Sequence, residues 1–211
     1  MPIQLSYPLF GCLKSVPTTA GTRRWRQHPA VRTHKALRPA PPGEPYLLRP
    51  HRPGDIGWVV ARHAAFYADE QAIGTSFEAL VARIAAGFIE RFDAQREACW
   101  IAERDGANVG SVFLVQARDE ATHRPVESVA QLRMLLVEPS ARGLGLGKQP
   151  IEECERFARH AGHRKIVLWT QASLLGVRGI YGAAGYGLTS RAPHHSFGQD
   201  LVGETWERVS A

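Results

Sequence analysis

The chain has 211 residues, enough for one domain of ordinary size and an appendage, and 26 Lys and Arg against 20 Asp and Glu give it a formal net charge of +6. No apolar run approaches the roughly 20 residues that a membrane-spanning helix needs, so the composition argues against a transmembrane protein. The three cysteines, Cys12, Cys99 and Cys154, have neither metal-ligand nor disulfide spacing. We therefore expect a soluble, cytoplasmic protein without a bound metal.

The positive charge lies at the beginning of the chain. Residues 1–43 hold seven Lys and Arg and no acidic residue, which leaves nineteen basic against twenty acidic residues in the remainder. Eight prolines interrupt the first 45 residues. We expect residues 1–44 to be a disordered basic extension rich in Pro and Arg. An organellar transit peptide, an upstream start codon and nucleic-acid contact through Arg23-Arg24-Trp25-Arg26 are the open alternatives.

After this extension the sequence becomes periodic, and its first elements are a strand and two helices. Residues 46–52 are expected to form the strand, and residues 56–68 a helix with Asp55 as its cap. A second helix is expected to begin with Ser76 as its cap. Its inner face is predicted to consist of Phe77, Leu80, Val81, Ile84, Phe88 and Ile89.

The middle of the chain predicts a hairpin and a further strand. Residues 99–103 and 109–116 read as strands joined by the turn residues 104–108, and residues 117–130 as a charged loop. Residues 131–137 form an apolar strand. Side-chain alternation on that strand predicts one face with Gln131, Arg133, Leu135 and Val137, and another with Leu132, Met134 and Leu136.

The last third alternates helices and strands. A glycine-rich loop, residues 142–148, leads into a helix that must start at about Gly147 or Lys148, because Pro150 is tolerated only in a first turn. A strand over residues 165–170, a helix over residues 173–184 and strands over residues 186–191 and 205–209 follow. This order predicts a mixed α/β (α+β) fold.

The glycine-rich loop is typical of an anion-binding site. A strand that passes through closely spaced glycines into a helix presents unpaired N–H groups and the positive end of a helix dipole to one point. A phosphate-binding Walker loop is excluded because Gln149, not Ser or Thr, follows Lys148. The dinucleotide fingerprint fails as well, since the glycines are spaced G-x-G-x-G and the next strand ends without a carboxylate. A plain glycine turn is the remaining alternative.

The pattern Q/R-x-x-G-x-G/A is satisfied by Arg142, Gly145 and Gly147, with Val137-Glu138-Pro139 before it and Tyr181-Gly182-Ala183-Ala184-Gly185-Tyr186 downstream. In these motifs the chain resembles the GNAT superfamily of acetyl-coenzyme A-dependent N-acetyltransferases. The resemblance covers residues 46–209 and implies one GNAT domain, residues 45–211, with a mixed central sheet of six to seven strands and helices on both faces. Residues 194–207 resemble the acetyltransferase half of proteins that fuse a MarR-type DNA-binding domain to a GNAT domain.

The resemblance also implies a binding site for acetyl-coenzyme A. The pantetheine arm would pair with the backbone of Leu135, Leu136 and Val137. The pyrophosphate would lie on the loop, where Gly143 is one of the binding residues. Arg142 and Lys148 would add charge, and N–H groups would come from Leu144, Gly145, Leu146, Gly147 and Lys148. Lys148 has a plain solvated surface residue as its alternative. Tyr181 occupies the position of the family's thiolate-protonating tyrosine, and a core tyrosine is its alternative. The family's Asn and Ala before that tyrosine are replaced by Leu174 and Val177.

The general base is missing from this pattern. Gln131 and Arg133 stand where better-known members carry Glu or His. Deprotonation is therefore expected through ordered water or by a group elsewhere, for which Glu103 and His123 are poor candidates. Arg133 is open to two roles, a substrate carboxylate or an internal salt bridge. The expected activity is direct acetyl transfer to a primary amine of a small molecule or peptide, by a monomer or homodimer. A coenzyme A-binding sensor without turnover and a nucleic-acid binder acting through the basic extension are the alternatives.

Overall fold

The computed structural model describes residues 45–119 and 121–209. The predicted extension, residues 1–44, lies outside the described residues, so the proposed domain boundary stays a prediction. Within the described part, no helix is long and apolar enough to cross a membrane. The order of elements is the expected one, a strand, two helices, three strands, a helix, a strand, a helix and two strands.

A seven-stranded sheet forms the centre of the molecule, with strand order β1-β2-β3-β4-β5-β7-β6. All neighbours are antiparallel except β4 and β5, which are parallel. This sheet confirms the predicted mixed α/β class. The strands are β1 (Leu47–Pro50), β2 (Ala98–Arg104), β3 (Ala107–Arg118), β4 (Pro125–Val137), β5 (Lys165–Gln171), β6 (Gly187–Ser196) and β7 (Gln199–Val209).

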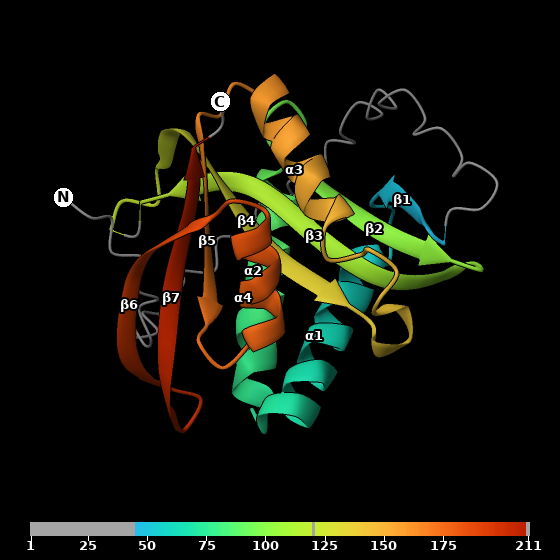
Figure 1. Ribbon diagram of the computed structural model, residues 1–211, viewed down its shortest axis with the longest axis vertical. Coiled ribbons are helices and arrows are strands. Elements are labelled where there is room, and N and C mark those ends of the chain that lie inside the picture. The colour runs from blue at the N-terminus through green and yellow to red at the C-terminus, as the bar shows by residue number, and fades with distance from the viewer. Residues whose placement is uncertain (1–44, 120, 210–211) are drawn as a thin grey trace, which may run out of the picture.

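Helices cover both faces of the sheet (Figure 1). They are α1 (Asp55–Gln71), α2 (Thr75–Arg91), α3 (Gln149–His160) and α4 (Leu175–Ala183), with a short 3₁₀ turn, η1 (Pro139–Ala141). Alternation along β3 divides the core, because Phe113 packs with α1 and α2, whereas its neighbours Val112 and Leu114 pack with α3 and α4. The sheet is therefore buried on both sides.

Both predicted helix caps are wrong. Gly54 and Gly74 occupy the cap positions, and neither helix has a side-chain cap. Asp55 is instead the first residue of α1 and is buried in an ion pair with Arg49 at 2.6 Å. Burial raises the pKa of Asp55, but hydrogen bonds from Arg49, the Arg52 N–H and Asn108 outweigh it and hold that pKa below its usual value.

Predictions for the strands and for the inner face of α2 also need correction. The predicted loop 117–130 is shorter, since β3 runs to Arg118 and β4 begins at Pro125. The closing strands are longer than expected, and His194 and His195 lie in β6 rather than in a loop. On α2, Ile89 was expected to face inward but is 57% exposed.

A bulge in β4 changes which side chains share a face. Ser111 on β3 pairs with Leu136 and Phe113 with Arg133, so two residues of β4 stand opposite one of β3, and Met134 has a φ of 52°. Met134 therefore packs toward α1 and α2, whereas Leu135 packs on the α3 and α4 side with Leu132. The expected grouping of Leu135 with Gln131 and Arg133, and of Met134 with Leu132, is wrong.

Just before this bulge, β4 and β5 separate. Their parallel pairing extends only from Val129 opposite Lys165 to Leu132 opposite Leu168, although β4 continues to Val137. Figure 1 shows the two arrows diverging toward their carboxyl ends. Among the described strands, the edge of β4 that faces β5 consequently has no partner after Leu132.

Candidate functional site

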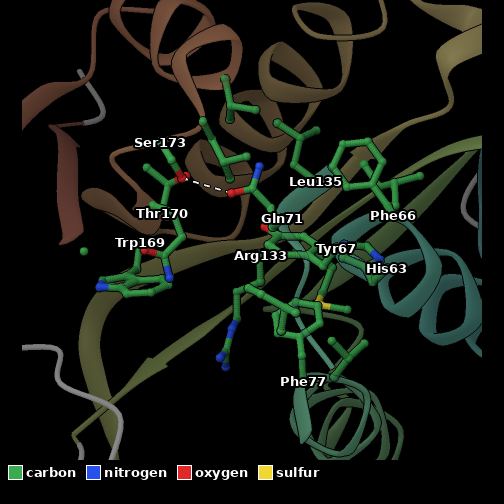
Figure 2. A pocket seen from close by; sticks show the side chains of 18 of the residues that line it. His63, Phe66, Tyr67, Gln71, Phe77, Arg133, Leu135, Trp169, Thr170 and Ser173 are labelled. Atoms are coloured by element: carbon green, nitrogen blue, oxygen red, sulfur yellow. Dashed lines mark hydrogen bonds between the residues drawn. The ribbon is translucent and has the colours of Figure 1, made fainter. Parts of the chain in front are cut away.

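A cavity of about 1840 Å³ occupies the space between the separated ends of β4 and β5. Ligand pockets for one small molecule usually measure about 300–1,000 Å³, so this cavity has room for more than one such ligand. Its walls come from α1, α2, the carboxyl ends of β4 and β5, the glycine-rich loop, α4 and the β6–β7 hairpin (Figure 2). The cavity thus connects the α3 and α4 side of the sheet with the α1 and α2 side.

The glycine-rich loop forms one end of the cavity. Gly143 and Gly145 both have a φ of 83°, a conformation that favours glycine, and the buried side chain of Leu146 fixes the loop to the core. A Cβ on Gly147 would lie 2.5 Å from Cδ1 of Ile180 on α4, so glycine permits the loop and α4 to approach each other. The glycine spacing seen in the sequence therefore has a conformational cause at two positions and a packing cause at the third.

The predicted N–H donors of this loop divide into two groups. In the described part of the chain, the backbone N–H groups of residues 143–147 have no protein acceptor. The N–H groups of Lys148 and Gln149 donate to the carbonyl of Gly145, at 3.0 and 3.2 Å. The expectation that Lys148 also offers an unengaged N–H group is therefore wrong. Helix α3 begins at Gln149 with Pro150 in its first turn, in agreement with the predicted start.

The two predicted cations beside the loop are paired with carboxylates. Nη2 of Arg142 lies 2.7 Å from Oε1 of Glu70 on α1, and its guanidinium is 5.6 Å from the centre of the Phe66 ring. Nζ of Lys148 lies 3.3 Å from Oε1 of Glu152, one turn along α3. Exposed pairs of this kind contribute about 0–1 kcal/mol, so an incoming anion can replace the carboxylates at small cost.

Tyr181 lies where α4 borders the cavity. It is 4% exposed, and its ring centre is 6.0 Å from that of Tyr186. Burial raises the pKa of the Tyr181 phenol, with a smaller contribution from Tyr67. The phenol is therefore protonated at neutral pH and can act as a hydrogen-bond donor. Val177 also lines the cavity, and Leu174 precedes α4 without a side-chain cap.

Of the residues predicted near the acceptor, two line the cavity and two do not. Gln131 and Arg133 both line the cavity, on the wall formed by β4 (Figure 2 labels Arg133). Glu103 and His123 are not among the described lining residues, and Glu103 pairs with Arg49 at 2.6 Å. Neither is therefore placed to serve as a base. In the described part of the chain, no group of three or more His, Cys, Asp or Glu could hold a metal ion.

Sequence reasoning missed a row of cavity residues on α1. The row follows helical spacing and contains His63, Phe66, Tyr67, Glu70 and Gln71. Nδ1 of His63 lies 2.9 Å from the carbonyl oxygen of Val59, which can only accept, so Nδ1 carries the proton and Nε2 the lone pair. Burial lowers the pKa of His63 to about 4, and the imidazole is therefore neutral. The spacing was visible in the sequence, but an apolar helix face predicts the same pattern.

Comparisons with known proteins agree on one family. Residues 66–186 match the model of the acetyltransferase (GNAT) family. Human N-acetyltransferase 8B is 32% identical over 96 residues, which are 46% of this chain and 41% of that protein, so the match spans about two fifths of the relative's length.

Solved structures of acetyltransferases share the fold. A Salmonella typhimurium protein assigned as an acetyltransferase, solved with its cofactor acetyl-CoA, matches with a TM-score of 0.65 at 16% identity over 79% of this chain and 95% of that chain. The ribosomal-protein-alanine N-acetyltransferase of Brucella melitensis gives 0.63 at 18% identity, over 77% and 99% of the two chains. At these identities the likeness shows the fold alone.

Proposed function

The chain belongs to the GNAT family of acetyltransferases, and from this premise we propose that residues 45–211 transfer an acetyl group from acetyl-coenzyme A to a primary amine of a small molecule or peptide. The observation that carries the proposal is the continuity of one cavity from the glycine-rich loop, past the separated ends of β4 and β5, to the α1 and α2 side of the sheet. This arrangement accommodates a long donor at one end and an acceptor at the other.

Each part of the cavity then has a task. The unpaired N–H groups of residues 143–147 and the positive end of α3 bind the pyrophosphate, with Arg142 and Lys148 adding charge. The edge of β4 that lacks a strand partner, at Leu135, Leu136 and Val137, binds the pantetheine amides by backbone hydrogen bonds. Acetyl-coenzyme A would supply the activated thioester.

Tyr181 assists the departure of the thiol. The amine nitrogen forms a bond to the acetyl carbon while the carbon–sulfur bond breaks, the nitrogen loses one proton, and the sulfur gains one. Tyr181 is a neutral phenol on the cavity wall, so it can donate a hydrogen bond to the sulfur as negative charge develops there. Gln131 and Arg133 line the acceptor part of the cavity and are proposed to contact the amine substrate.

A second candidate function is a coenzyme A-binding sensor without turnover. Of the described residues that line the cavity, Glu70 is the one carboxylate, and it is paired with Arg142. A base that would generate the neutral amine is therefore not provided by an acidic side chain of the described lining. This observation favours either amines that enter as the free base or a protein that binds coenzyme without reaction.

Calorimetry and turnover together separate these functions. We expect acetyl-coenzyme A to bind the full chain with one site, and a panel of primary amines to produce acetylated products by mass spectrometry at a rate that rises with pH. Binding without any product would support the sensor. Absence of binding would refute both functions.

A further inference from the structure

The acceptor part of the cavity carries an excess of positive charge. The described lining residues include three guanidinium groups, those of Arg83, Arg133 and Arg142, against the single carboxylate of Glu70. The Arg142 and Glu70 groups are paired at 2.7 Å at the loop end. Arg83 on α2 and Arg133 on β4 are therefore the charged side chains that the described lining contributes on the α1 and α2 side of the cavity.

An apolar surface lies beside these two arginines. Phe77, Leu80 and Ile84 of α2 line the cavity at helical spacing, and Trp169 of β5 lines it from the sheet. Phe77 stacks on Tyr67 of α1 with ring centres 4.2 Å apart. Figure 2 shows Phe77, Trp169 and Arg133 around the same cavity. A ligand that fits this wall has a flat or bulky apolar body as well as a negative charge.

The same wall contains a buried polar atom without a partner. Gln171, the last residue of β5, is 5% exposed and lines the cavity, and its Oε1 has no hydrogen-bond donor among the described residues. Nε2 of His194, whose ring centre is 5.6 Å from that of Trp169, has none either. Buried polar atoms are normally paired, so the oxygen of Gln171 indicates that the ligand brings a donor, whereas Nε2 of His194 accepts or donates according to its tautomer.

We propose that the acceptor is a primary amine with an aromatic or bulky apolar body and a carboxylate, and that Arg133 binds the carboxylate. This inference rests on the proposed acetyltransferase function and specifies its substrate class. A guanidinium binds a carboxylate with two parallel hydrogen bonds, and Arg83 adds favourable charge at the same side. Polycationic amines are disfavoured because the described lining offers them cations and no unpaired carboxylate.

The first experiment compares matched acceptors with the wild-type full chain. The probes are L-phenylalanine and 4-(2-aminoethyl)benzoate, each with its uncharged carboxamide, and spermidine as a polycation. At least one carboxylate is expected to exceed its own amide in kcat/KM by roughly tenfold or more, and spermidine to be the poorest. Equal or better turnover of both amides, or of spermidine, would overturn the substrate class while leaving acetyl transfer intact. Loss of both acetyl-coenzyme A binding and all turnover would instead refute the proposed function.

The second experiment assigns the carboxylate to Arg133. Arg133→Gln is expected to raise KM for the carboxylate acceptor by roughly 10- to 100-fold, with little change in KM for acetyl-coenzyme A or in kcat/KM for the amide. Arg133→Lys should recover part of the loss. Arg104→Gln, at an exposed arginine that is not among the described lining residues, is the matched control and should behave as wild type. An equal loss for the carboxylate and its amide would show a structural role and overturn the assignment.

Discussion

Replacement of Tyr181 by Phe isolates the proposed proton donor from the packing of its ring. The phenol is buried between the cavity and the core cluster of α3 and α4, and Phe fills the same place without the hydroxyl. Because the ring remains, coenzyme affinity and the free energy of unfolding are expected to change little. The change in turnover then reports on the hydroxyl.

The size of the effect follows from two pKa values. An alkyl thiol has a pKa of about 8.5 and a phenol of about 10, so complete proton transfer from phenol to thiolate costs roughly 2 kcal/mol. Burial raises the pKa of Tyr181 further and increases this cost. Tyr181 therefore acts mainly as a hydrogen-bond donor to the developing thiolate, an interaction of about 1.5–3 kcal/mol. Turnover should fall by roughly 10- to 150-fold, toward the lower end of general-acid catalysis.

The assay is steady-state formation of acetylated amine with both substrates varied, followed by chromatography. A decrease in kcat with KM for acetyl-coenzyme A unchanged is the expected result. Tyr186→Phe is the matched control, because that hydroxyl is buried without a partner among the described residues and Tyr186 is not among the described residues that line the cavity. Removal of its hydroxyl should leave kcat unchanged. Wild-type kcat in Tyr181→Phe, or equal losses in both variants, would refute the role of Tyr181.

Three further predictions test the loop and the core. Gly145→Glu should abolish calorimetric binding of acetyl-coenzyme A. Gly145→Ala places an uncharged side chain at the same position, where φ is 83°, and should retain most of that binding. Equal losses of binding in the two variants would mean that backbone strain is the cause. Pro150→Ala should keep the affinity for acetyl-coenzyme A within a few-fold of the wild-type value. It should change the free energy of unfolding in urea by well under the roughly 3 kcal/mol that a proline inside a helix costs. A gain in stability of that full amount would contradict the helix start. Asp55→Asn should lower the free energy of unfolding at pH 7 by roughly 2–3 kcal/mol, because Glu103 is then the one carboxylate partner that Arg49 keeps among the described residues. Since folding lowers the pKa of Asp55, the contribution of its carboxylate to the free energy of unfolding is complete above about pH 4 and is lost at lower pH. The stabilities of the wild type and the variant should therefore converge in acid. A difference that stays constant with pH would exclude this link between ionisation and stability.

The parts of the fold that the sequence predicts well have local causes. The glycine-rich loop could be read from its spacing, because positive φ at Gly143 and Gly145 is a property of single residues. The hairpin between β2 and β3 was predictable for the same reason, since Asp105 and Gly106 both have positive φ. The position of Pro150 in the first turn of α3 likewise follows from its own ring.

The errors arise where a distant residue decides the outcome. Asp55 resembles a helix cap, but Arg49 on the neighbouring strand binds its carboxylate. The bulge at Met134 cannot be recognised in a continuous run of apolar residues. It nevertheless changes which face of the sheet each following side chain of β4 occupies. The pairing of Arg142 with Glu70, which is 72 positions away in the chain, could not be predicted from the sequence either.

Because the pairing between β4 and β5 is short, the sheet consists of two groups of strands that are joined over only a few residues. Four register positions join a leaf made of β1 to β4 to a leaf made of β5, β7 and β6. Beyond them β4 extends for five residues, about 16 Å at the rise of a strand, so a rotation of about 5° at the joined end would move the far end by roughly 1.4 Å. The glycine-rich loop follows β4 on the first leaf and α4 follows β5 on the second, so the loop and α4 belong to opposite leaves at the open end. A donor that bonds to β4 while touching α4 would tie the leaves together and fix the distance across which the acetyl group must pass.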